Sequence, residues 1–194
     1  MEKIIIGLVG VVVGSILTLA KDLLNLYLNR KERAKYLAIR VTFQLESFVD
    51  ECIEVARDDG RVMGPDEQGC IQLYTSPASI SFESLDVDWK SLPIDLMYKI
   101  LNLPSNIKNA EERISGVADF GSGPPMYEEE TEERRLQHVK LGLVADDLSK
   151  ELRIKYNLPE RERDLKKILK KLKFEINKIR QKRISKENKN KIIP

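Results

Sequence analysis

Apolar positions follow two different patterns along the chain. Residues 4–20 carry no charged side chain, and Ser15 and Thr18 hold the only hydroxyl groups among them. Beyond this stretch, apolar residues recur three or four positions apart between charged ones, which is the period of amphipathic helices. The pattern predicts an all-α protein, with one apolar N-terminal helix followed by a helical bundle or coiled-coil-like domain of about four helices.

The apolar stretch predicts a transmembrane helix. Its 17 residues rise roughly 26 Å, slightly less than a hydrocarbon core of about 30 Å. Lys21 can reach the headgroups and Tyr27 can act as an aromatic interface residue, which makes up the difference. We therefore expect an anchor with an interfacial turn over residues 1–28.

Basic residues set the expected orientation. Only Lys3 and Glu2 precede the stretch as charged residues, whereas a positive cluster follows it. Positive flanks remain in the cytoplasm, so we expect a single-pass protein of a cell inner membrane, with the N-terminus outside and the domain in the cytoplasm. Thr18 and Ala20 also loosely resemble a cleavage site, so a cleaved signal peptide is the alternative. The predicted membrane-interface residues are Lys21, Tyr27, Arg30, Lys31, Arg33 and Lys35.

Glycines inside the apolar stretch suggest contact between helices. Gly10 and Gly14 form a GxxxG pair, and Gly7 and Thr18 lie near the same face. Small residues at this spacing let two helix backbones approach closely. We take these four residues as a candidate helix-association face; the competing interpretation is that glycine is common in membrane helices and the spacing arises by chance.

The domain proper is predicted over residues 29–184. Its first helix has no Gly or Pro before Gly60 and can continue directly from the anchor as one rod. The expected helices are 30–58, then 93–118 in two segments joined at Pro104, a third after the breaker at 121–125, and a last one from Pro159 or Glu160.

A long irregular loop, 59–92, follows the first helix. Ile71–Tyr74 and Ile80–Phe82 could be extended segments. A connection this long inside a compact domain is often functional, so the loop is the first place to look for a binding site. Trp89, the only tryptophan, either anchors a partner or packs the loop onto the core.

Charge is distributed unevenly. The whole chain carries a formal +2, yet residues 159–194 hold 14 Lys and Arg against 5 Asp and Glu. The last helix therefore has a candidate basic surface, which is either a solvated face or a contact for anionic lipid or nucleic acid. Residues 185–194 are predicted to be a basic flexible tail. The basic-surface residues are Lys166, Lys167, Lys170, Lys171 and Lys173.

Catalytic and metal-binding patterns are missing from the sequence. It contains no GxxxxGK[ST], HExxH, CxxC or GxSxG. His138 is the only histidine, and the adjacent Asp146 and Asp147 point to different sides of a helix. The five glutamates at 128–130 and 132–133 are better explained by the dipole of a helix start than by a metal site. We expect no enzyme, cofactor or metal.

The functional prediction depends more on the predicted anchor than on the helical domain. We expect an interaction or scaffold module that positions a cytoplasmic domain at the membrane, with the lipid bilayer and either another protein or a second copy as partners. One alternative is a membrane-active effector or small channel subunit that oligomerises through the glycine-bearing span. Another is a membrane-tethered nucleic-acid binder, which the scarcity of aromatic residues beside the lysines argues against.

Overall fold

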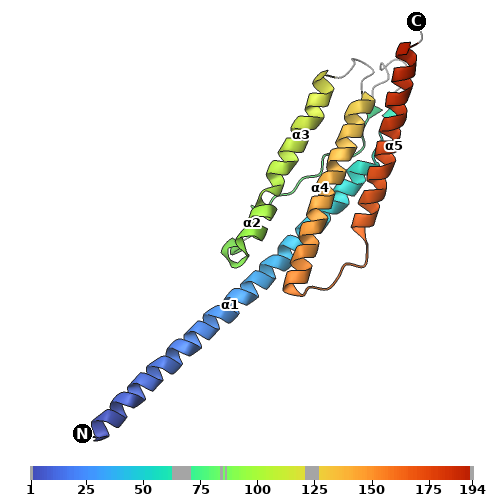
Figure 1. Ribbon diagram of the computed structural model, residues 1–194. Coiled ribbons are helices and arrows are strands. Elements are labelled where there is room, and N and C mark those ends of the chain that lie inside the picture. The colour runs from blue at the N-terminus through green and yellow to red at the C-terminus, as the bar shows by residue number, and fades with distance from the viewer. Residues whose placement is uncertain (1, 63–70, 84, 86, 121–126, 193–194) are drawn as a thin grey trace.

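The protein is an all-α bundle with one helix extending far beyond the others (Figure 1). The computed structural model describes residues 2–62, 71–83, 85, 87–120 and 127–192. Within these ranges, the side chains of 2–13, 61–62, 118–120, 127, 187 and 190–192 are not described.

Helix α1 (Glu2–Arg57) is a single rod of 56 residues. The prediction that the first bundle helix continues directly from the N-terminal stretch is therefore confirmed. From Ala34 onward, the residues at spacings of three and four are buried in the core, Leu37, Val41 and Leu45 completely. The helix ends before Gly60, whose positive φ of 70° suits a residue without a side chain.

The predicted transmembrane stretch, 4–20, lies in the projecting part of α1. Its residues 4–13 fall outside the described side chains. In the part of the chain that the structure describes, none of the helices has an apolar run sufficient to cross a membrane.

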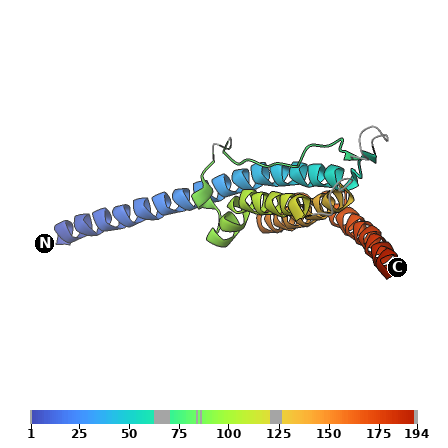
Figure 2. The same cartoon turned by 90° about the horizontal axis from the view of Figure 1, so that it is seen from above.

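The long loop contains a small hairpin and then an extended segment. β1 (Arg61–Val62) pairs antiparallel with β2 (Ile71–Gln72), with Arg61 opposite Gln72. The extended segment runs back along α1 (Figure 2). Residues 80–82, which the sequence allowed to be extended, form no strand, and their alternation reflects burial of Phe82 against the helices.

A 3-10 turn, η2 (Trp89–Ser91), leads into α2 (Ile94–Leu101) and α3 (Leu103–Phe120). The helix break lies at Asn102, two residues before Pro104. Pro104 has no N–H to donate to the carbonyl of Ile100, so the helical hydrogen bonds are interrupted there, while proline is tolerated in the first turn of α3. The predicted division of this region into two segments is confirmed.

Helix α4 (Tyr127–Tyr156) is the central helix and contacts α1, α3 and α5. It ends at Asn157, which has φ of 50°, and Leu158 N–H donates to the Arg153 carbonyl at 2.9 Å. A left-handed residue with this returning hydrogen bond is a common helix terminus, for which asparagine is suited after glycine.

Helix α5 (Leu165–Ile192) begins later than predicted. The expected start at Pro159 or Glu160 is wrong because Asp164 forms the helix start instead: its carboxylate accepts a hydrogen bond from Lys167 N–H at 3.2 Å. The helix continues to Ile192, past Ser185, where we expected helical order to be lost.

Candidate functional site

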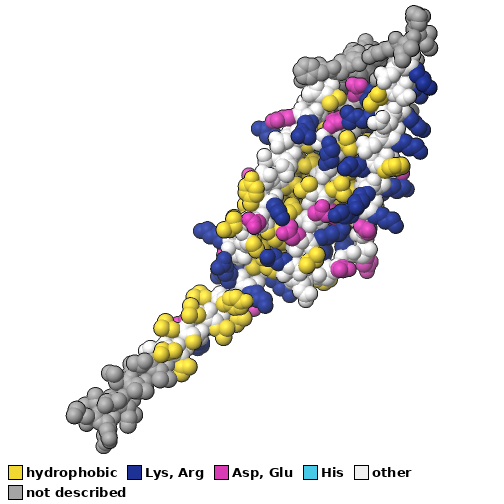
Figure 3. Space-filling model, viewed as in Figure 1, with side chains coloured by type: hydrophobic (Ala, Val, Ile, Leu, Met, Phe, Trp, Pro, Cys, Tyr) yellow, Lys and Arg dark blue, Asp and Glu magenta, His cyan; other side chains and the backbone are white. Residues whose placement is uncertain are grey.

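The most unusual surface is the stem of α1, defined as residues 14–33, which projects from the bundle. Every one of these residues is exposed. Figure 3 shows apolar side chains covering the stem where it leaves the bundle. Soluble proteins rarely leave so many neighbouring large apolar side chains uncovered, and surfaces of this kind are typical of sites that contact another protein or a membrane. The large exposed ones are Ile16, Leu17, Leu19, Leu23, Leu24, Leu26, Tyr27 and Leu28.

The apolar side of the stem is continuous with the core side of the same helix. At about 100° per residue, Ile16, Leu23 and Tyr27 fall on the line that Ala34 and Cys52 follow inside the bundle. The last two are at most 5% exposed, whereas the first three are 59–67% exposed. One face of α1 is therefore covered in its second half and bare in its first.

A polar arc occupies the opposite side of the stem. Thr18, Asp22, Asn25 and Asn29 fall within about 60° of one another around the helix. This arc faces away from the side on which the bundle packs. The stem is thus amphipathic, with a broad apolar face and a narrower polar one.

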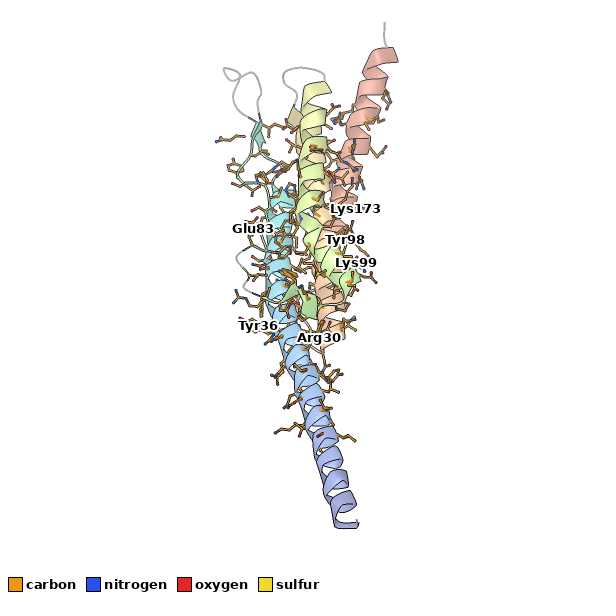
Figure 4. The ribbon with its side chains drawn as sticks, turned by 90° about the vertical axis from the view of Figure 1, so that its left-hand side faces the viewer. Arg30, Tyr36, Glu83, Tyr98, Lys99 and Lys173 are labelled. Atoms are coloured by element: carbon orange, nitrogen blue, oxygen red, sulfur yellow. The ribbon has the colours of Figure 1, made fainter. Side chains whose placement is uncertain are left out.

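The six predicted membrane-interface residues are all exposed on α1. Arg30 marks the point where α1 meets the bundle: its Nη2 donates to the Lys90 carbonyl of η2 at 3.3 Å (Figure 4). In the described part of the chain, Lys31, Arg33 and Lys35 form no ion pair with a carboxylate. Their charges are available to a partner.

The candidate helix-association face is described only in part. Gly7 and Gly10 lie outside the described side chains. At Gly14 an added Cβ would meet nothing within 4 Å, and the Thr18 hydroxyl donates back to the Gly14 carbonyl at 2.9 Å. The described part of this face, Gly14 and Thr18, is exposed and open to a neighbouring helix.

The basic surface of α5 is partly neutralised. Lys166 is bonded to Asp147, which raises the pKa of the ammonium through the hydrogen bond and the opposite charge. Lys171 lies 3.8 Å from Glu175. Lys167 and Lys170 are exposed on α5. Lys173 is half-buried on the same helix (Figure 4).

Trp89 packs the loop against the core. It is half-buried, and its ring meets the buried Phe82 edge-on at a centroid distance of 5.8 Å and an angle of 78°. Most of its surface is used inside the protein, so the geometry favours the packing interpretation of Trp89 over that of a partner anchor.

A buried polar clamp fixes the far end of the loop. The Asp58 carboxylate accepts hydrogen bonds from Gly60 N–H, Tyr74 N–H and both the N–H and hydroxyl of Thr75. Burial alone would raise the pKa of Asp58, but these hydrogen bonds outweigh it and lower the pKa. Arg134 of α4 completes the clamp, because its Nη2 donates to the Thr75 carbonyl at 2.6 Å and its Nη1 lies 3.7 Å from Asp58.

His138 forms a second attachment for the loop. Its Nδ1 donates to the Arg134 carbonyl at 2.8 Å, so Nε2 is free to accept from Ala78 N–H at 3.3 Å. Burial lowers the pKa of the imidazole, and the positive charge of Arg134 lowers it further. The hydrogen bond to the backbone carbonyl of Arg134 and the negative charge of Glu111 act in the opposite direction and raise the pKa. The histidine therefore has a structural role.

A groove near the end of α4 brings together charges that sequence reasoning missed. It encloses about 350 Å³ between α1, α4 and the connection to α5. Arg153 bonds Glu46 at 2.8 Å, and Arg161 bonds Asp50 at 2.7 Å. The partners are more than 100 residues apart, so no local pattern could reveal them. Because these charges neutralise one another, the groove offers no excess charge to a ligand.

The glutamates at the start of α4 have partners as well. Arg183 of α5 contacts Glu129 at 2.6 Å and Glu132 at 3.0 Å, and Arg180 contacts Glu133 at 3.1 Å. These pairs hold α4 and α5 together near their outer ends. Among the described residues, no group of three or more His, Cys, Asp or Glu is arranged to hold a metal ion.

Comparisons with known proteins give no relative: no family model, curated protein or solved structure matches the chain.

Proposed function

We propose that this protein is a single-pass, membrane-anchored helical scaffold whose bundle is held at the membrane surface and binds another protein there. The observation that carries the proposal is the bare apolar stem. Its large apolar side chains are 46–67% exposed, a surface that is unfavourable in water and that a bilayer covers from all sides.

The apolar length of the N-terminal sequence supports this role. The charge-free residues 4–20 lead without a break in α1 into the exposed apolar residues of the stem. Residues 4–28 rise roughly 37 Å as a helix, which crosses a hydrocarbon core of about 30 Å with some tilt. The cations at Arg30, Lys31, Arg33 and Lys35 follow at once, which supports a cytoplasmic bundle.

The bundle supports a positioning role rather than chemistry. Its buried charged groups are used in attaching loop and helices, as with Asp58 and Arg134. The surface that remains for a protein partner includes a shallow groove of about 300 Å³ between α2, α3 and α4, lined by Tyr98, Asn102 and Val144 among others. Tyr98 and Val144 are 68% and 43% exposed.

Membrane extraction tests the anchor. The intact protein should remain in the membrane pellet after alkaline carbonate washing. The double variant Val12→Arg, Ile16→Arg places two charges near the middle of the span, at about 2.5–3.5 kcal/mol each, and should move the protein to the supernatant. The control Lys166→Gln, Lys170→Gln alters charge on α5 and should stay in the pellet. Release of the unaltered protein by carbonate would refute the anchor.

Cysteine labelling tests the orientation. Cys52 is fully buried, and burial raises the pKa of its thiol, so it cannot serve as the probe in the folded protein. With Cys70→Ser, a cysteine introduced at the exposed Ser185 should react with an impermeant maleimide only after the inner membrane is opened. Reaction in sealed cells would place the bundle outside.

Crosslinking separates this function from that of an oligomeric channel or effector. The open space around Gly14 accommodates a larger side chain in the single chain, so Gly10→Leu with Gly14→Leu should leave the bundle folded. A glycine-dependent oligomer would dissociate in this variant. The scaffold proposal expects the same bound protein partner, recovered from membranes, with and without the two substitutions.

A further inference from the structure

The two faces of the stem define how α1 meets a bilayer. The apolar face is on the side of the bundle, and the polar arc with Asp22, Asn25 and Asn29 is on the opposite side. Where such a helix leaves the bilayer at a tilt, it is most stable when the polar arc at the interface stays nearest the water and the apolar face turns toward the hydrocarbon. The resulting tilt brings the bundle side of α1 down toward the membrane surface.

This tilt brings one end of the bundle close to the membrane surface. It is the end from which the stem emerges. We call it the base and define it by Arg30 and Lys31 of α1, Lys90 of η2, Ile94 of α2, and Ile154 and Lys155 of α4. Figure 1 shows that α2 begins, and α4 ends, beside the point where α1 leaves the bundle. The bond from Arg30 to the Lys90 carbonyl joins two of these elements directly.

The base combines exposed apolar side chains with cations. Ile154 is 83% and Ile94 77% exposed, the two highest values among the described large hydrophobic residues. Each has an exposed lysine nearby in the chain: Lys155 follows Ile154 and Lys90 precedes Ile94. Apolar side chains flanked by cations are the composition of surfaces that insert shallowly among lipid headgroups.

We infer that the base docks on the anionic headgroups of the same bilayer that holds the stem, with Ile94 and Ile154 inserted at the headgroup level and the cations against lipid phosphates. The inference rests on the proposed anchor. It adds a second, charge-dependent membrane contact that fixes the angle of the bundle and leaves its sides free for a protein partner.

Charge complementarity favours lipid as the occupant of the base. Residues 30–35 hold four basic residues and one acidic one. The other base elements and the adjacent connection between α4 and α5 are nearly balanced, with Asp95 exposed on α2 and Glu160 on the connection. The cationic part is thus the part nearest the span, where headgroups lie. Each cation near an anionic surface should raise the docking equilibrium constant about fivefold.

Depth-dependent fluorescence on the full-length protein in nanodiscs tests the docking. Single probe cysteines at Ile94 or Ile154, with Cys70→Ser and the buried Cys52 retained, carry a small fluorophore. The matched control is Ser185→Cys near the outer end of α5. In discs containing phosphatidylglycerol, lipids spin-labelled near the headgroup should quench the probes at 94 and 154 but not the one at 185, and aqueous iodide should show the reverse order.

Charge variants sharpen the result. Lys31→Gln with Lys90→Gln should lower the docking constant by about 25-fold and expose both base probes to iodide. Lys186→Gln with Lys189→Gln on outer α5 should not change it, and circular dichroism should show the bundle folded in both. Discs of pure phosphatidylcholine should resemble the first variant.

The possible failures are distinguishable. If the protein enters the discs but the probes at 94 and 154 stay as accessible to iodide as that at 185, the docking inference is wrong and the anchor stands. If the protein does not co-elute with the discs, the proposed anchor is wrong, and the docking inference fails with it.

Discussion

The two halves of α1 place the same kind of surface in different surroundings. In the bundle half, Leu37 and Leu45 are completely buried, whereas Leu23 and Leu24 of the stem are 67% and 58% exposed. Both halves carry their apolar residues on one continuous face. The difference shows that helical periodicity determines which face of a helix must be covered, while the tertiary structure determines what covers it.

Truncation of a core side chain should give the largest difference between the halves. Phe48→Ala in the bundle half, where Phe48 is 1% exposed, should lower the free energy of unfolding by about 3–5 kcal/mol. Leu24→Ala in the stem should change it by less than about 0.5 kcal/mol. Urea unfolding of the detergent-solubilised protein, followed by circular dichroism, measures both. Equal losses would mean that the stem packs against the bundle.

A closely packed glycine should give a smaller effect. A Cβ at Gly142 of α4 would lie 3.1 Å from the Cβ of Cys52 in the bundle half of α1 and 3.1 Å from Leu169 of α5. Gly142→Leu should therefore destabilise the bundle by about 1–3 kcal/mol through overpacking. Gly116→Leu is the control, since an added Cβ there meets nothing within 4 Å. It should be neutral or stabilising in the same unfolding assay.

Acidification should weaken the bundle half through the loop attachments. The pKa of His138 is lowered in the folded state, so the unfolded chain binds more protons as the pH falls below about 6.5, and stability decreases there. A proton on Nε2 would also prevent this atom from accepting the hydrogen bond of the Ala78 N–H. Asp58, whose pKa is likewise lowered, adds a further loss below about pH 4.

The variant His138→Gln provides the check on this pH dependence. Its free energy of unfolding, measured from pH 8 to pH 5, should vary less than that of the unaltered protein. The loop backbone from Tyr74 to Ala78 should also lose hydrogen-exchange protection at pH 5 only in the protein that retains the histidine. An unchanged slope in the variant would exclude His138 as the titrating group.

Local signals were sufficient for most of the fold. The uninterrupted run up to Gly60 predicted the continuous α1, and the missing N–H of Pro104 predicted the break between α2 and α3. The start of α5 was predicted too early, because proline and two glutamates imitate a helix start that Asp164 provides five residues later.

Contacts between distant residues could not be predicted. The clamp joins Asp58 to Thr75 and Arg134, and no periodicity connects positions so far apart. The exposed stem could be anticipated from its composition. The base could not, because Lys90, Ile94 and Ile154 come from three elements that only the folded bundle brings to one end.

The continuity of α1 has a mechanical consequence. Residues 21–57 contain neither glycine nor proline, and the helix is unbroken over this length, so it lacks the residues at which helices commonly kink. A rotation or tilt of its N-terminal end would therefore be transmitted along the helix to the bundle. In a bilayer, changes in thickness that alter the tilt of the helix would swing the bundle and change which of its sides faces a partner.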